Sequence, residues 1–148
     1  MCSNPVSSRP SISNAGSSSS AAKLSPAFIR LAWSNLAAQS ASQSTVTLAS
    51  APATGSYRVS YYLDQNGTCT SGSNAVSLSF NWADGSSARV LTTGSLTLGS
   101  VQSTSGYLSG TAPLYVGSGN VTYTSTVAGS CTSGTSSYDV HVALERLQ

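Results

Sequence analysis

The fold is decided near the C-terminus by the stretch Tyr138-Asp-Val-His-Val-Ala-Leu-Glu-Arg-Leu147. Every second side chain from Tyr138 to Leu144 is apolar, and those between them are polar or small. This alternation predicts a β-strand with one face on a hydrophobic core and the other in water. Such a strand needs an equally long partner, and Gly55 to Leu63 shows the same pattern. We expect these two strands to pair, with the chain between them folded back onto the pair.

The remainder of the chain after residue 44 is patterned as further short strands. They are predicted at residues 45–48, 75–83, 88–93, 95–98, 106–116 and 120–127, with 106–116 as two pieces around Pro113. Turn signals such as Asn66-Gly67 and Asp84-Gly85 separate them. Residues 65–73 and 128–137 are rich in Gly, Ser and Thr and are predicted as loops. Seven or eight strands without a convincing helix predict an all-β, antiparallel β-sandwich or jelly-roll-like domain at 45–148.

The composition and charge of the chain argue against some classes of function. Charged residues make up 7% of the 148 residues, and the net charge is +2. The six basic residues are scattered, so the sequence predicts neither nucleic-acid nor membrane binding. No stretch is long and apolar enough to cross a bilayer, and the N-terminus lacks the basic and apolar regions of a signal peptide.

The first 44 residues are predicted to form a Ser/Ala-rich arm that is partly extended or disordered. Residues 1–22 contain too few apolar side chains to offset the entropy of ordering them. They are either a disordered tail or an arm that becomes ordered on a partner surface. Residues 23–39 fit a short helix capped at Ser25-Pro26 or an irregular strand along the sandwich, and we favour the extended form. Trp33 is expected to be buried against the domain or against a neighbouring subunit.

Two segments have nearly the same sequence around a cysteine: Thr68-Cys69-Thr-Ser-Gly72 and Ser130-Cys131-Thr-Ser-Gly134. If the two long strands pair antiparallel, both segments lie at the same end of the sandwich. Cys69 and Cys131 would then come within disulfide range. Free thiols in a reducing cytoplasm and pairing between chains are the alternatives, and Cys2 is left over. A zinc site is not predicted, because no two cysteines are close in the sequence and the chain has only one histidine.

Candidate chemistry is sparse. His141 lies on the outward face of its strand and is predicted to be a surface or interface residue. The carboxylates do not converge in the predicted strands and turns as glycoside hydrolysis requires; they are Asp64, Asp84, Asp139 and Glu145. We expect Asp64 or Glu145 to pair with Arg58 or Arg146 across the strands. The sequence predicts neither catalysis nor a cofactor. Tyr62 points outward from its strand and is either an interface residue or an isolated exposed tyrosine.

Several stretches resemble a β-domain encoded in structural genes of tailed bacteriophages and prophages. They are Leu36-Ala-Ala-Gln39-Ser-Ala41, Thr45-Val-Thr-Leu48, Pro52-Ala-Thr-Gly55-Ser-Tyr57-Arg-Val-Ser-Tyr-Tyr-Leu63, Ser79-Phe-Asn-Trp82-Ala-Asp84 and Val140-His-Val-Ala-Leu-Glu-Arg-Leu147. The likeness spans roughly residues 35–148 and concerns pattern, not a catalytic motif. The cysteine-bearing segments depart from the usual pattern, and there is no long upstream fibre repeat.

The resemblance implies a trimeric β-sandwich on a virion surface, without enzyme activity or cofactor. A short chain with one arm is similar to capsid decoration, cement or head-fibre proteins. Its partners would be copies of itself and the major capsid protein or another virion protein. It would be made in the host cytoplasm and would stay on the particle surface. The subunit or capsid interface is expected at Phe28, Ile29, Leu31, Trp33, Leu36 and Tyr62.

The alternative function is a tail-fibre or adhesin-like module that binds a carbohydrate or another receptor. A glycan site needs clustered exposed aromatic side chains. Most aromatic residues here alternate inward, which counts against this alternative; they are Tyr57, Tyr61, Phe80, Trp82, Tyr123 and Tyr138.

Overall fold

A computed structural model describes residues 29–99 and 106–147, and the N-terminal part of the predicted arm, residues 1–28, lies outside them. The described residues form β-strands and no helix. The strands are β1 (Ile29–Gln39), β2 (Gln43–Ala49), β3 (Gly55–Gln65), β4 (Cys69–Asp84), β5 (Ser87–Thr92), β6 (Leu96–Leu98), β7 (Tyr107–Val116), β8 (Ser118–Gly134) and β9 (Tyr138–Arg146).

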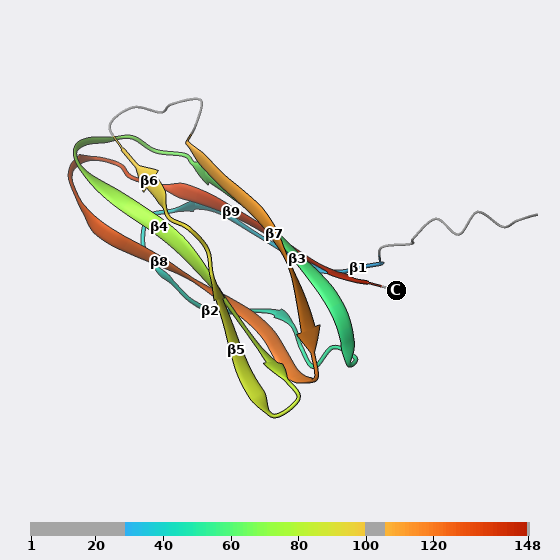
Figure 1. Ribbon diagram of the computed structural model, residues 1–148. Helices are drawn as coiled ribbons and strands as arrows, with labels where there is room; N and C mark the ends of the chain where they lie inside the picture. Colours follow the sequence, from blue (N-terminus) through green and yellow to red (C-terminus); the bar gives the residue numbers. More distant parts are fainter. Residues whose placement is uncertain (1–28, 100–105, 148) are drawn as a thin grey trace, which may run out of the picture.

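The strands form two sheets that pack face to face in an elongated sandwich (Figure 1). Sheet A has the order β1-β9-β3-β7, and sheet B has the order β2-β8-β4-β5 with β6 also paired to β4. Every strand pair is antiparallel. The predicted all-β antiparallel sandwich is therefore confirmed.

The pair β3 and β9 lies at the centre of sheet A, as the alternating patterns predict. The ladder runs from Tyr57 opposite Arg146 to Gln65 opposite Tyr138. Its inward side chains, such as Val59 and Leu144, have no exposed surface. Burying one such side chain contributes about 1.5–3 kcal/mol, so the alternating apolar faces of the two strands account for much of the core.

Strand β1 begins at Ile29, so the sandwich includes residues before position 45 that were predicted to belong to the arm. It pairs with the outer edge of β9, from Ile29 opposite Arg146 to Gln39 opposite Tyr138, and thereby covers backbone groups that β9 would otherwise leave unpaired. Leu36 packs against the core. The predicted arm therefore contributes a regular strand, and the helical alternative is wrong over residues 29–39.

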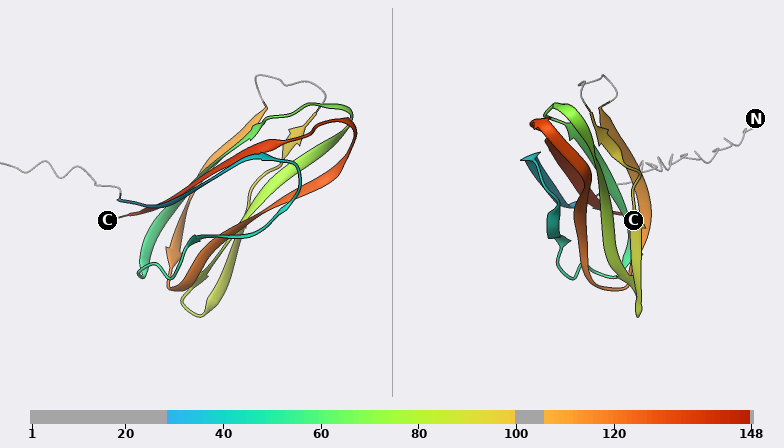
Figure 2. Two further views of the ribbon diagram at one scale, coloured as in Figure 1. Left: turned by 180° about the vertical axis from the view of Figure 1, so that it is seen from behind. Right: turned by 90° about the vertical axis from the view of Figure 1, so that its left-hand side faces the viewer.

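The corner between β1 and β2 crosses from one sheet to the other at one edge of the sandwich (Figure 2). A chain of hydrogen bonds holds it. The Gln43 backbone N–H donates to Ser125 Oγ at 3.0 Å, and Ser125 Oγ lies 2.6 Å from the Tyr138 hydroxyl. The Tyr138 hydroxyl donates to the Ala41 carbonyl at 2.8 Å. The buried tyrosine thus ties the corner to strands of both sheets.

Two predicted loops are strand in the structure. β4 begins at Cys69 and β8 continues to Gly134, so the ladder between them includes much of residues 65–73 and 128–137. The register shifts between Ser71 and Gly72, where Gly72 has φ +86° and a Cβ would lie 2.4 Å from the Ser130 carbonyl oxygen. β7 is likewise one strand instead of two pieces. Its Pro113 is tolerated because β7 is an edge strand with one open side.

Candidate functional site

The disulfide between Cys69 and Cys131 lies at one end of sheet B. The two Cα atoms are 5.6 Å apart, and the bond links the neighbouring strands β4 and β8. Cys69 is fully buried and Cys131 is half-buried. Cys2 lies outside the described residues. Within residues 29–99 and 106–147 no group of three His, Cys, Asp or Glu side chains could hold a metal ion.

The outward face of sheet A carries the candidate site, and we call it the outer face. Strand register places its side chains in rows that run across the sheet. The rows are Arg30, Glu145, Arg58 and Pro113; Trp33, Ala143, Ser60 and Thr111; Asn35, His141, Tyr62 and Ser109; and Asp139, Asp64 and Tyr107. Four strands that are distant in sequence therefore contribute neighbouring side chains.

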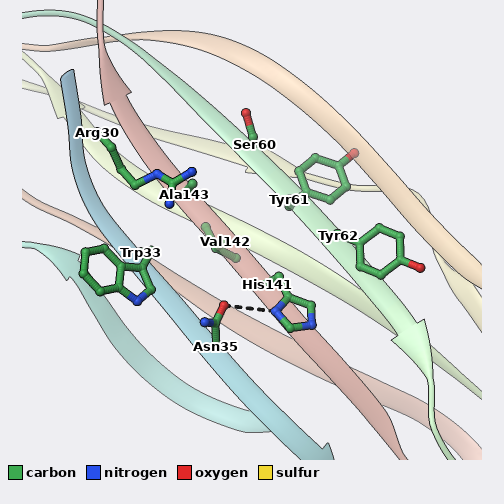
Figure 3. A pocket seen from close by; sticks show the side chains of 9 residues that line it. All are labelled: Arg30, Trp33, Asn35, Ser60, Tyr61, Tyr62, His141, Val142 and Ala143. Atoms are coloured by element: carbon green, nitrogen blue, oxygen red, sulfur yellow. Dashed lines mark hydrogen bonds between the residues drawn. The ribbon is translucent and has the colours of Figure 1, made fainter. Parts of the chain in front are cut away.

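A shallow hollow of about 370 Å³ lies over the second row (Figure 3). Its floor is formed by Ser60 and Ala143, two small side chains that face each other on the central strands. Trp33 from β1 and Tyr62 from β3 project around this floor (Figure 3). The hollow exists because two small residues face each other in register between rows of larger ones.

Aromatic side chains around the hollow are unusually exposed. Trp33 is 67% exposed and Tyr62 is 39% exposed. The Tyr62 ring stacks on Tyr107 with the ring centroids 5.6 Å apart, and it lies 6.0 Å from the His141 ring. Neighbouring rings therefore hold Tyr62 in place on the surface. Clustered exposed aromatic groups of this kind mark binding surfaces more often than isolated ones do.

Polar groups line the same hollow. His141 Nδ1 lies 3.0 Å from Asn35 Oδ1, and because an amide oxygen only accepts, Nδ1 is the donor (Figure 3). Arg30 and the Ser60 hydroxyl add further hydrogen-bonding groups. The histidine is thus a surface residue held in orientation by Asn35, as its place on the outward face predicts.

Glu145 and Asp139 make structural contacts on the outer face. Glu145 Oε2 accepts from Arg58 Nε at 3.0 Å and from Arg58 Nη2 at 2.5 Å, which is one of the ion pairs expected across the strands. Asp139 Oδ1 accepts from the Ala38 backbone N–H at 2.6 Å and from Asn66 Nδ2 at 3.0 Å. These groups orient backbone and side chains across the outer face.

The residues predicted to form an interface are exposed, half-buried or outside the described residues. Ile29 and Leu31 are 50% and 44% exposed at the start of β1, and Trp33 and Tyr62 are exposed around the hollow. Leu36 is half-buried and packs against the core. Trp33 is not buried against the domain, because it lies on the outward side of an edge strand. Phe28 lies outside the described residues.

A second hollow of about 570 Å³ lies beside the disulfide, between the β1–β2 corner and the ends of β4 and β8. Asn74 Oδ1 and Ser136 Oγ are buried there without a protein hydrogen-bond partner. Its lining is dominated by Ser, Thr and Gly, and no ring lies on it. The outer-face hollow therefore offers the richer set of contacts.

The described part of the chain contains no helix long and apolar enough to cross a membrane. Comparisons of the chain with family models, with curated proteins and with solved structures give no match.

Proposed function

We propose that the chain is a non-enzymatic structural protein of a tailed-phage virion, of the capsid decoration, cement or head-fibre type, anchored through its N-terminal segment. The observation that carries this proposal is the exposure of Ile29 and Leu31, 50% and 44%, at the beginning of edge strand β1. These apolar side chains directly follow the Ser-rich residues 1–28. Together they form a continuous segment suited to bind along a partner surface.

The proposed partners are the major capsid protein, or another virion protein, and two further copies of this chain. Three arms on one trimer would bind together, because each bound arm raises the effective concentration of the others at the particle. A weak contact per arm then suffices for stable decoration. The sandwich would face outward on the particle surface after assembly in the host cytoplasm.

The test is co-sedimentation of the full chain with purified phage particles that lack it. We expect Ile29→Ser with Leu31→Ser to abolish particle binding while thermal unfolding stays unchanged, because neither side chain is part of the core. The matched control is Val90→Ser, which changes a side chain 64% exposed on the other sheet. Light scattering of the free protein should give three times the mass of one chain. Unimpaired binding of the double variant would refute the anchoring role of β1.

A receptor-binding module is the second candidate. The cluster of exposed rings on the outer face supports it, because a role confined to the arm gives no reason for these rings. The two functions are compatible, since one uses the start of β1 and the other uses the outer face of the sheet. Particle binding and receptor binding should therefore respond to different substitutions.

A further inference from the structure

We propose that the hollow over Ser60 and Ala143 binds one pyranose ring of a carbohydrate. Side-chain rows on one face of a strand are about 6.8 Å apart, so the rows of larger side chains on either side of the floor are separated by roughly 14 Å. The space between them is about 370 Å³, within the range of small-ligand sites. It is open to solvent on the outer face, so an end or a branch of a glycan can enter it.

The first requirement of a sugar ring is a flat apolar surface. A pyranose has one or two faces of C–H bonds, and these pack on aromatic rings, which carry partial negative charge on their faces. Trp33 offers this surface at the rim of the hollow, with 67% of its area accessible. Tyr62 offers a second ring, and its stack on Tyr107 restrains it before any ligand binds. A restrained ring loses little entropy on binding, which favours affinity.

The second requirement is a set of groups that both donate and accept, because each sugar hydroxyl does both. Asn35 provides an amide, and His141 is oriented by its hydrogen bond to that amide. Ser60 supplies a hydroxyl on the floor, and Arg30 supplies guanidinium donors at one end. These groups surround the floor on several sides, as Figure 3 shows for the labelled residues.

The same face is a poor fit for other classes of ligand. The central strands β3 and β9 are paired on both sides, so an extended peptide cannot add to them as a further strand. The outer face carries three carboxylates, at Asp64, Asp139 and Glu145, beside the guanidinium groups of Arg30 and Arg58, so it lacks the excess of positive charge that binds the phosphates of nucleic acids. A neutral, hydroxyl-rich ring meets neither obstacle.

The experiment is a glycan array probed with the full chain, followed by calorimetric titration with the strongest oligosaccharide. We expect Trp33→Ala to weaken binding at least tenfold and Trp33→Phe to weaken it by less than about threefold, because a phenyl face still packs on the ring. Ser60→Trp should abolish binding by filling the floor. Tyr115→Ala is the matched control, since Tyr115 is 48% exposed on the same face but does not line the hollow, and it should change affinity less than twofold.

Each variant is checked for an unchanged unfolding temperature, and Trp33 suits this design because its exposed side chain contributes little to the core. Tryptophan emission should shift to shorter wavelength on sugar binding in the natural chain and not in Trp33→Phe. No glycan bound at millimolar concentration, or binding that survives Ser60→Trp, overturns the proposal. If Trp33→Ala instead converts an oligomer to a monomer and no glycan binds, the outer face is a contact between copies. Loss of particle binding in the Ile29 and Leu31 variant leaves this site unaffected, so the two proposals fail separately.

Discussion

Removing the Cys69–Cys131 disulfide should destabilise the sandwich chiefly through the unfolded chain. The bond closes a loop with a sequence separation of 62 residues, which corresponds to about 4 kcal/mol of lost loop entropy in the unfolded state. The folded state should change little, because the ladder between β4 and β8 extends far beyond the bond, to Ala83 opposite Ser118. For a domain of about 110 residues, 4 kcal/mol corresponds to a decrease in Tm of roughly 15–20 °C.

The assay is thermal and guanidinium unfolding followed by circular dichroism, in a Cys2→Ser background that excludes thiol exchange with the third cysteine. The oxidised chain is compared with the same chain under reductant and with Cys69→Ala and Cys131→Ala combined. We expect both bond-free forms to lose similar stability and to show a larger m-value, because their unfolded chains expose more surface. An equal Tm and m-value with and without the bond would refute the reasoning. It would mean that residual contacts already constrain the unfolded chain.

Three further predictions concern the core and the outer face. Gly110→Ala should lower the free energy of unfolding by about 1–3 kcal/mol in chemical denaturation. The new Cβ would lie 2.6 Å from Cζ of Tyr61 and would overlap with that packed ring. Burial raises the pKa of the Tyr138 hydroxyl above its usual value of about 10, and a hydrogen bond with a serine opposes this in part. The free energy of unfolding should therefore be constant below about pH 9 and fall above pH 10, less steeply in Tyr138→Phe. A double-mutant cycle on Arg58 and Glu145 should give a coupling of about 0.5–1 kcal/mol that decreases at high salt; no coupling at low salt would contradict the ion-pair geometry.

The sequence predicted well the strands that have one apolar and one polar face. It predicted poorly the strands whose two faces are alike in polarity. β3 and β9 were identified because their inward residues are all apolar over seven positions, 57–63 and 138–144. β1 was predicted only as an irregular extended segment, because its outward side also carries apolar residues and because bulges after Arg30 and Leu36 interrupt its alternation. The end of β8 was missed because Gly, Ser and Thr dominate both of its faces. There the pairing with β4 and the disulfide decide the structure, and neither is a local property.

The candidate site was only partly predictable for a related reason. Tyr62 could be assigned outward from its own strand, and Tyr57 and Tyr123 could be assigned to the core, where they are buried. The hollow depends on Trp33, Ala143 and Ser60 sharing one row, and that row is set by the register of three strands. Inward alternation of most aromatic residues counted against a glycan site. The exposed ones nevertheless gather on one sheet.

The contrast between the two outward faces is the strongest argument that the outer face has a function. On sheet B the outward ladder between the central strands β4 and β8 is made mostly of small residues, such as Ser77 with Thr126 and Ser79 with Thr124, and the large apolar side chain exposed beside it is Val90 on β5. This shows that the fold is compatible with Ser and Thr at exposed central positions of its sheets. Exposed rings on sheet A are therefore not required for folding, and they carry the risk of aggregation that exposed apolar surface brings. The exposure of Trp33 and Tyr62 on one face, beside a floor of small residues, therefore supports the binding surface proposed there.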